Sequence, residues 1–446
     1  MPGVPLIAGA AAASPVAWRE GRAITAAQYL ADAARLAALL PACAHVLNAC
    51  ADRYRFAVGL GAALLRGQVT LLPPDHTPQT VQRLREFAAD TYALADGTDA
   101  APGLPQVQVP LDAAPLAADC TVPSIPHGQL CAIVFTSGST GTPLPNRKHW
   151  GTLERNVRGA LERWGLAPAR AAVLGTVPPQ HMYGFESTVL APLMGGGALC
   201  AERPFFADDI CAALERLPRP RVLVTTPFHL RALLEDVPRP PAADLLLCAT
   251  APLEAELAAL AEARFGAALL EIYGCTETGQ MATRRTARAA DWLTLPGIRV
   301  ELRGASAWAS GGHVEQPTAL GDVLEPLAPD RFLLRGRVSD MVNIAGKRSS
   351  LAHLEMHLRA IDGVSDGVFY VPDDAAAGGV TRLAAFVVAP GLTRETLLAE
   401  LRRRIDAAFL PRPLVLLERL PRAASGKLPR EVLRELARAH GVRSGP

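Results

Sequence analysis

The hydrophobic and polar positions of residues up to about 290 switch repeatedly between helical and strand periodicity. Thr25 can cap a helix that runs through Leu40, since Leu30, Ala34 and Ala37 fall on one helical face. Short apolar runs between turn residues alternate with such helices. The pattern predicts strands at 44–48, 69–72, 171–177, 221–225, 245–250 and 268–273, and further helices at 56–65 and 79–88. This alternation is typical of parallel sheets flanked by helices.

The character of the chain changes after residue 290. Short strands are predicted at 298–302, 321–325 and 331–334, followed by a helix at 350–361, strands at 367–371 and 383–388 and a helix at 394–408. We therefore predict an α/β fold with two domains. Residues 1–336 form a large N-terminal domain of parallel sheets flanked by helices, with a small β-rich subdomain, and residues 337–446 form a small, mobile α+β C-terminal domain.

Composition narrows the class of protein. The 446 residues are 50% hydrophobic and 20% charged, which indicates a globular chain with more than one core. The net charge of +2 gives no basic field for nucleic acid, and no apolar run predicts a membrane span. The eight cysteines form no Cys-x-x-Cys pair, and the apolar N-terminus has no basic residue before Arg19. We expect free thiols in a reducing compartment and a cytoplasmic protein.

A candidate phosphate-binding loop follows the buried-strand pattern of residues 131–135. Its glycines let backbone N–H groups approach an anion, its hydroxyls add donors, and successive amides can form an anion nest. It is not a Walker A loop, because the Gly-Lys-Ser/Thr ending is absent. A Ser/Gly-rich turn without a ligand is the alternative. The candidate residues are Thr136, Ser137, Gly138, Ser139, Thr140 and Gly141.

This loop resembles the hallmark of adenylate-forming enzymes, the superfamily of acyl-CoA synthetases, peptide-synthetase adenylation domains and luciferases. Members carry a lysine soon after the loop's proline, where this chain has Leu144, so Lys148 is the candidate for that contact with ATP. The segment Tyr273-Gly-Cys-Thr-Glu277 resembles the family's Tyr-Gly-x-Thr-Glu. The resemblance implies that Tyr273 packs on adenine, Thr276 contacts the α-phosphate and Glu277 holds Mg²⁺. A capped helix start is the alternative for this segment.

Further matches follow in the family's order along the chain. The resemblance implies that Asp322 binds the ribose hydroxyls, that Arg337 contacts the ribose or phosphate beside an interdomain hinge at 335–340, and that Lys427 is the catalytic lysine. Ser339 departs from the usual hinge residue. The backbone residues implied to line the adenine are Thr250, Ala251 and Pro252.

The same resemblance implies a reaction in two halves. A small carboxylic acid attacks Mg-ATP to form an acyl-adenylate, the C-terminal domain rotates, and a thiol of coenzyme A or of an acyl carrier protein takes the acyl group. Lys427 would stabilise the charge that develops during adenylation. His181 is implied to lie beside the carboxylate, although a packed structural role is the alternative for a lone histidine. The expected pocket residues are His181, Phe185, Ala249, Ile272 and Gly274.

Two details resemble a narrower group of enzymes. The patterns Thr-Pro-x-Pro-x-x-Lys-x-Trp, ending at Trp150, and Pro-Pro-Gln-His-Met-Tyr-Gly, ending at Gly184, are similar to the ligases of bacterial aryl polyene and xanthomonadin pigment synthesis. This implies that a hydroxybenzoate or related aryl acid is loaded onto an acyl carrier protein. One alternative is a coenzyme A ligase for a medium-chain or 3-hydroxy acid. Another is a catalytically impaired nucleotide-binding module, given Leu144 and Ser339. An α/β-hydrolase is excluded, because no Gly-x-Ser-x-Gly elbow lies on a strand–helix turn.

Overall fold

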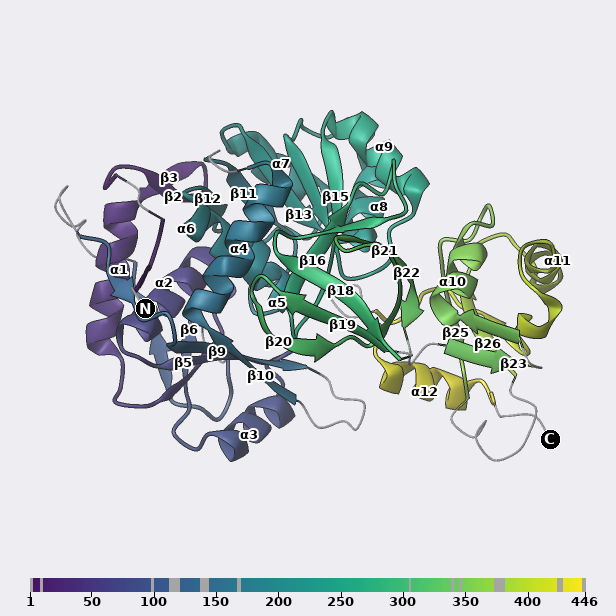
Figure 1. Cartoon of the computed structure of the whole chain (residues 1–446), viewed down its shortest axis with the longest axis horizontal. Helices are drawn as coiled ribbons and strands as arrows, with labels where there is room; N and C mark the ends of the chain where they lie inside the picture. Colours follow the sequence, from purple (N-terminus) through teal and green to yellow (C-terminus); the bar gives the residue numbers. More distant parts are fainter. Residues whose placement is uncertain are drawn as a thin grey trace. The chain divides into compact units, whose positions relative to one another are not determined.

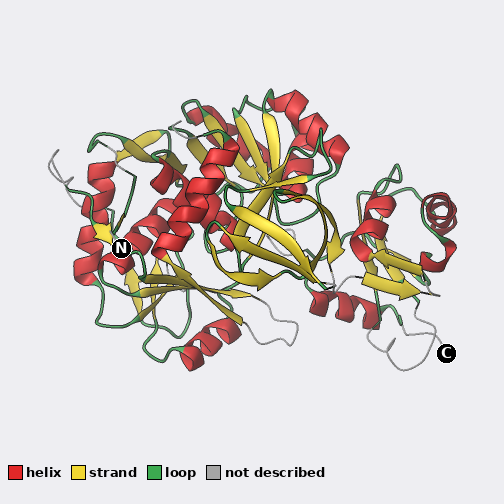
Figure 2. Cartoon of the chain, viewed as in Figure 1, coloured by secondary structure: helices red, strands yellow, loops and turns green. Residues whose placement is uncertain are grey.

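The computed structural model of the protein describes residues 3–8, 11–97, 100–111, 121–136, 144–166, 170–304, 306–337, 341–344, 347–372, 382–422 and 428–442. Backbone contacts divide the chain into two compact units. Unit 1 comprises Met1–Ala249, Ala255–Arg299 and Ala309–Thr318, and unit 2 comprises Thr250–Glu254, Val300–Trp308 and Ala319–Pro446. The domain boundary at 336/337 stays a prediction. Figure 1 traces the elements along the chain, and Figure 2 separates helices from strands.

The first sheet of unit 1 has the strand order β10-β9-β5-β4-β6-β7, and its neighbours are parallel except for the antiparallel pair β9–β10. Apolar side chains of its strands pack against Val81 and Leu84 of helix α3. The strands are β4 (His45–Asn48), β5 (Val69–Leu72), β6 (Tyr92–Ala95), β7 (Gln106–Gln108), β9 (Leu130–Thr136) and β10 (Leu144–His149). The helices between them are α2 (Arg53–Leu65) and α3 (Pro78–Phe87), and the short strands β1 (Val4–Pro5) and β8 (Ser124–Ile125) pair separately.

The second sheet of unit 1 has the order β17-β16-β15-β14-β13-β11-β12-β2-β3. The run from β15 to β2 is parallel, so the carboxyl ends of these strands share one edge, where α/β proteins place ligands. The strands are β2 (Pro15–Arg19), β3 (Arg22–Thr25), β11 (Ala172–Gly175), β12 (Ala198–Cys200), β13 (Arg221–Thr225), β14 (Leu245–Cys248), β15 (Ala268–Cys275), β16 (Gly279–Arg284) and β17 (Trp292–Thr294). The accompanying helices are α1 (Ala26–Leu39), α4 (Trp150–Trp164), α5 (Met182–Gly184), the π-helix η1 (Phe185–Leu190), α6 (Ala191–Gly195), α7 (Ala207–Arg216), α8 (Pro227–Asp236) and α9 (Ala255–Phe265).

The chain passes between the two units within three consecutive strands, β18 (Ile298–Arg303), β19 (Ser306–Gly311) and β20 (Val314–Ala319). Unit 2 then contains the hairpins β21 (Asp322–Ala328) with β22 (Arg331–Arg337) and β23 (Met341–Ile344) with β24 (Lys347–Ser350).

A small sheet of order β25-β26-β27 organises the rest of unit 2. Alternate strand residues form two apolar layers, because successive side chains of a strand point to opposite faces. One layer packs with residues of α10 and α11 and the other with residues of α12. The elements are α10 (Leu351–Arg359), β25 (Asp366–Tyr370), β26 (Ala384–Val388), α11 (Arg394–Arg404), the 3₁₀ turn η4 (Ala407–Phe409), β27 (Leu414–Leu416) and α12 (Arg430–Ala439).

The predicted elements occur in the predicted order, and several of them begin or end at other residues than predicted; β11, for example, ends at Gly175 rather than at residue 177. The helix predicted from residue 56 begins at Arg53, because the Asp52 carboxylate accepts a hydrogen bond from the Arg55 N–H at 2.8 Å and caps it. The strand predicted to reach residue 250 ends at Cys248, since the backbone turns to φ +85° at Thr250. The last predicted helix ends at Arg404 rather than at residue 408, where a short 3₁₀ turn follows.

Candidate active site

The predicted phosphate loop lies between the two strands of a hairpin. Strand β9 ends at Thr136, β10 begins at Leu144, and these two residues are paired in the antiparallel register. Ser137, Gly138, Ser139, Thr140 and Gly141 lie outside the described residues, as does the side chain of Thr136. The Leu144 side chain is 56% exposed, so the position where the resemblance leads us to expect a lysine presents an apolar group to solvent.

Lys148 lies on β10 and reaches a second loop. Its side chain is buried, and its ammonium donates to the carbonyl of Thr276 and, at 3.2 Å, to the carbonyl of Glu277. Burial lowers the pKa of Lys148, while the nearby Glu186 carboxylate opposes that shift. Lys148 therefore ties the strand that leaves the phosphate loop to the predicted α-phosphate and metal residues. Its predicted contact with ATP stays a prediction.

The Tyr273–Glu277 segment lies at the carboxyl end of β15 and the turn that follows. Gly274 is exposed at a bulge in the pairing of β15 with β16, Thr276 is half-buried and Glu277 is exposed. This corrects one alternative from the sequence, because the segment ends a strand and enters a turn, and no helix begins there. An exposed carboxylate beside a hydroxyl is an oxygen donor set that fits Mg²⁺, which takes one or two carboxylates together with phosphate oxygens and water.

Tyr273 has an aromatic neighbour within the protein. Its ring is buried, with its centroid 5.5 Å from that of Trp292, and the Arg284 guanidinium lies 4.5 Å above the Trp292 ring. The Arg284 charge also pairs with the buried Glu271 carboxylate at 2.7 Å. Packing against Trp292 fixes the Tyr273 ring, and its stacking on adenine stays a prediction.

Buried polar side chains surround the turn after β15. His313 Nε2 lies 2.9 Å from the Thr278 carbonyl, Gln280 Nε2 donates to the Ser187 hydroxyl at 3.0 Å, and Asn156 Nδ2 lies 2.8 Å from His313 Nε2. Glu186 on the π-helix is 1% exposed, and burial raises its pKa to about 8. These residues were missed from the sequence. The available signal for Glu186 was a glutamate inside a segment with no other charged residue, since a glutamate is rarely buried without a partner.

The segment carrying His181 crosses the carboxyl edge of the second sheet. The Tyr183 hydroxyl shares its one proton between the carbonyls of Thr225 at 3.1 Å and Leu247 at 3.0 Å, near the ends of β13 and β14. His181 Nε2 lies 3.0 Å from the Pro74 carbonyl, and because a carbonyl only accepts, this nitrogen carries the proton. His181 is thus fixed against the β5–α3 loop, and its contact with a substrate carboxylate stays a prediction.

Arg53 supports the same segment from within the protein. It is fully buried, and its two terminal nitrogens donate to the carbonyls of Gly175, Val177, Cys200 and Glu202 at 2.8–3.0 Å. Burial lowers the pKa of Arg53 to about 10, so the guanidinium remains charged at neutral pH. These carbonyls lie at or just beyond the ends of β11 and β12, and Arg53 therefore fixes the start of the loop that carries His181.

The expected pocket walls fall into two groups. Ala249 and Ile272 are buried and continue the adjacent parallel strands β14 and β15, so the fold brings them together at the carboxyl edge, with Gly274 close by in sequence. Phe185 has no exposed surface and packs edge-to-face on Phe56, with centroids 6.3 Å apart. Its role as a pocket wall stays a prediction.

The remaining candidates belong to unit 2. Asp322 and Arg337 are partners in the register of the β21–β22 hairpin, so the two residues implied to bind ribose lie opposite each other. Thr250 is a non-glycine residue with a left-handed backbone, and Ala251 and Pro252 follow it. Such a conformation costs about 1 kcal/mol or more and is concentrated at functional sites. Lys427 and Ser339 lie outside the described residues.

Comparison with known proteins decides the family. The sequence model of the AMP-binding enzymes matches residues 8–305. The chain belongs to the AMP-binding enzyme family. Relatives include a 4-coumarate–CoA ligase of Rhodobacter capsulatus, 33% identical over 279 residues that cover 62% of this chain and 68% of the relative. A feruloyl-CoA synthase of an Amycolatopsis species is 29% identical over 356 residues, covering 70% of this chain and 71% of the relative.

Solved structures of AMP-binding enzymes share the fold. ATP-bound MatB from Rhodopseudomonas palustris has a TM-score of 0.82 at 20% identity, covering 97% of each chain. The O-succinylbenzoate coenzyme A synthetase of Bacillus subtilis, in complex with AMP, has a TM-score of 0.79 at 17% identity, covering 94% of this chain and 95% of that chain. These structures confirm the predicted α/β class, and the family model and the relatives confirm the predicted assignment to an AMP-binding ligase family.

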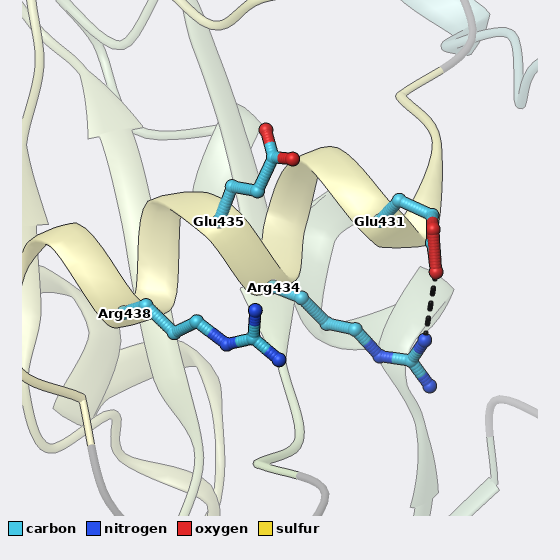
Figure 3. Close-up of a pocket in the computed structure, with 4 residues that line it drawn as sticks. All are labelled: Glu431, Arg434, Glu435 and Arg438. Atoms are coloured by element: carbon cyan, nitrogen blue, oxygen red, sulfur yellow. Dashed lines mark hydrogen bonds and ion pairs between the residues drawn. The ribbon is translucent and has the colours of Figure 1, made fainter.

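Two further structural facts bear on this AMP-binding enzyme. Among the described residues, none of the helices combines the length and apolar character needed to cross a membrane. An open hollow of about 190 Å³ lies along α12, lined by Glu431, Arg434, Glu435 and Arg438 (Figure 3). All four side chains come from one helix, and Glu431 and Arg434 form an ion pair at 3.1 Å. It is a solvated helix face without apolar walls and contains none of the candidate residues.

Proposed function

We propose that this chain activates an aryl carboxylic acid, such as a hydroxybenzoate, as an acyl-adenylate and transfers the acyl group to the phosphopantetheine thiol of an acyl carrier protein. The observation that carries the adenylation step is the bond from Lys148 on β10 to the carbonyls of Thr276 and Glu277. It joins two segments, 128 residues apart in sequence, that were each predicted to bind ATP phosphates.

The first half-reaction forms one bond and breaks one bond. A carboxylate oxygen of the acid attacks the α-phosphorus of ATP, the bond to the β-phosphate oxygen breaks, and pyrophosphate leaves with its electron pair. Thr276 would donate its hydroxyl to the α-phosphate, and Glu277 would hold Mg²⁺, which when bound neutralises phosphate charge. Catalysis here requires positioning and charge stabilisation rather than a protein nucleophile.

In the second half-reaction the carrier's thiolate attacks the acyl carbon, the carbon–oxygen bond to AMP breaks, and a thioester forms. Lys427 is proposed to act in the first half by bridging the acid's carboxylate and the α-phosphate. Lys427→Ala should abolish nearly all pyrophosphate exchange while thermal unfolding is unchanged. If Lys427→Ala exchanged pyrophosphate at the wild-type rate, Lys427 would have no part in the mechanism. If the wild-type protein exchanged no pyrophosphate with any acid, the alternative of a catalytically impaired nucleotide-binding module would be favoured.

An aryl acid is supported by the relatives and by the resemblance to the pigment-cluster ligases. The relatives are named for 4-coumarate and ferulate, which are both hydroxycinnamic acids. An ATP–pyrophosphate exchange panel of hydroxybenzoic, hydroxycinnamic, medium-chain and 3-hydroxy fatty acids tests the assignment. We expect the highest kcat/KM with a hydroxybenzoate, and exchange with fatty acids alone would overturn the aryl assignment.

A coenzyme A ligase is the second candidate, and the names of the relatives favour it. The two acceptors are separated by incubating the enzyme, ATP and the preferred acid with either coenzyme A or a purified holo-carrier protein. Mass spectrometry of both products then compares the initial rates. A mass increase on the carrier with little acyl-CoA supports the proposal, and efficient acyl-CoA formation with an unmodified carrier supports the second candidate.

A further inference from the structure

We propose that Lys148 is a positioning residue that fixes the backbone of Thr276 and Glu277 in the arrangement needed to receive ATP and Mg²⁺. The proposal rests on the function proposed above and deepens it. It assigns to Lys148 a task different from the direct contact with phosphate that the sequence suggested.

The geometry of the Lys148 ammonium supports a role through the backbone. The side chain is only 6% exposed, and its Nζ donates to two consecutive carbonyls, those of Thr276 and Glu277. An ammonium has three donors and no acceptor, so two of its three hydrogen bonds are committed to this turn. A buried ammonium in this state is poorly placed to meet a phosphate in solvent.

Two carbonyls that converge on one nitrogen define a backbone conformation. In an extended strand, successive carbonyls point in opposite directions, so Thr276 and Glu277 can share one donor only in a turn. The structure has a turn at these residues, between the ends of β15 and β16. Lys148 thereby selects the conformation from which the half-buried Thr276 and the exposed Glu277 side chains project.

Buried polar side chains next to Gly279 also restrict the conformation of the Thr276–Glu277 turn. Gly279 has φ +76°, and a Cβ there would come within 2.3 Å of Asn156 Nδ2 and 2.6 Å of Glu186 Oε1. The turn is therefore held between a buried cation and a wall of buried polar side chains, with little room to move.

The position of Lys148 in the chain gives the anchor a second consequence. It lies four residues after Leu144, on the strand that leaves the phosphate loop, and β10 is paired with β9 along its length. A displacement of the β9–β10 hairpin would therefore be transmitted to the Thr276–Glu277 turn through one side chain. The anchor keeps two phosphate-binding segments in a fixed relation within unit 1.

The experiment compares Lys148→Met with Arg147→Met, an exposed neighbour on the same strand. For Lys148→Met we expect kcat of pyrophosphate exchange to fall about 100-fold, since displacements near 1 Å have effects of this size. The Mg²⁺ concentration for half-maximal rate should rise several-fold, while the KM of the acid changes less than about threefold. Arg147→Met should leave all three quantities unchanged.

Hydrogen exchange measured by mass spectrometry supplies a readout that does not need activity. Amides of residues 273–281 should exchange faster in Lys148→Met than in wild type, with the rest of unit 1 unchanged. Lys148→Arg, which keeps the charge and the donors, should recover part of both kcat and protection, and it serves alone if the methionine variant does not fold.

Two results would overturn the proposal about Lys148. If Lys148→Met raised the KM for ATP and left the hydrogen exchange of residues 273–281 unchanged, Lys148 would contact the phosphates directly, and the proposal would be overturned. A lower unfolding temperature with unchanged kcat and Mg²⁺ dependence would show a purely structural lysine and also overturn it. If wild-type protein exchanges pyrophosphate with no acid, the proposed function fails, while the hydrogen-exchange comparison still decides whether Lys148 holds the turn.

Discussion

Two buried cations in unit 1 hold loops at the carboxyl edge of the second sheet, and they do so differently. Arg53 spreads four hydrogen bonds over the ends of β11 and β12, whereas Lys148 concentrates on two adjacent carbonyls in one turn. A planar guanidinium has five donors in a fixed fork, and an ammonium is a compact point charge. Arg53 is thus suited to joining separate strands, and Lys148 to shaping one loop. The comparison predicts that Arg53 governs stability and Lys148 governs catalysis.

The largest effect is expected for Arg53→Met. Removing the guanidinium leaves three buried carbonyls and the half-buried carbonyl of Glu202 with fewer partners, which should lower the free energy of unfolding by roughly 3–5 kcal/mol. Urea titration followed by circular dichroism measures this. Arg66→Met, at the exposed end of the same helix, is the control and should cost less than about 0.5 kcal/mol. If Arg53→Met were as stable as Arg66→Met, Arg53 would not be the buried cation that governs stability.

Gly279→Ala tests the wall that restrains the Lys148 turn. The new methyl group meets Asn156 and Glu186, and the backbone is left-handed, so we expect the free energy of unfolding to fall by about 2–4 kcal/mol and the Mg²⁺ concentration for half-maximal rate to rise. Gly266→Ala is a matched control, because its φ is +67° and a Cβ there would have no neighbouring atom within 4 Å. It should cost only about 1 kcal/mol and leave activity intact.

Acid should lower the free energy of unfolding through His229, a buried histidine that contacts Thr176, the residue between two of the carbonyls that Arg53 binds. His229 Nδ1 lies within hydrogen-bond distance of the hydroxyls of Thr176, at 3.2 Å, and Thr226, at 3.0 Å. Burial lowers the pKa of His229 to about 4. The unfolded chain binds the proton near pH 6.5, so stability is complete above that pH and is lost as pH falls toward 4, by roughly 2–3 kcal/mol. Urea unfolding at several pH values between 7 and 4 measures the slope of the free energy of unfolding against pH. His229→Asn should flatten it, and an unchanged slope would exclude this histidine.

The smallest effect is expected at Thr250, where the loop after β14 has backbone strain. A threonine at φ +85° is disfavoured, so Thr250→Gly should raise the free energy of unfolding by about 1 kcal/mol. Thermal unfolding with and without ATP is the measurement. Destabilisation by glycine would mean that the threonine side chain contributes more than the strain costs.

Local rules accounted for most of the fold. Thr25 caps α1 as expected, with its hydroxyl accepting from the Gln28 N–H at 3.2 Å, because capping depends on residues three positions apart. Apolar runs gave the strands because burial on both faces of a parallel sheet demands them. The Asp52 cap was missed, and α2 consequently began three residues earlier than predicted.

The candidate site was predicted only in part, since motifs name residues but not their partners. The sequence marked Tyr273, Thr276, Glu277 and Lys148 as residues that meet ATP. It did not show that Lys148 donates to the backbone of the other loop, or that Tyr273 packs on Trp292. Asn156 was not considered, because nothing in a helical pattern tells a solvated polar residue from one facing a distant strand.

The sequence by itself determined the order of the elements, the α/β class and the family, because periodicity, caps and short motifs are local properties of the chain. Only the tertiary structure decided what the buried charges do. The sequence analysis assigned Lys148 to ATP and did not single out Arg53, and the roles of both residues depend on carbonyls more than 100 residues away. A buried cation must find acceptors wherever packing places them, and packing is a property of the whole fold.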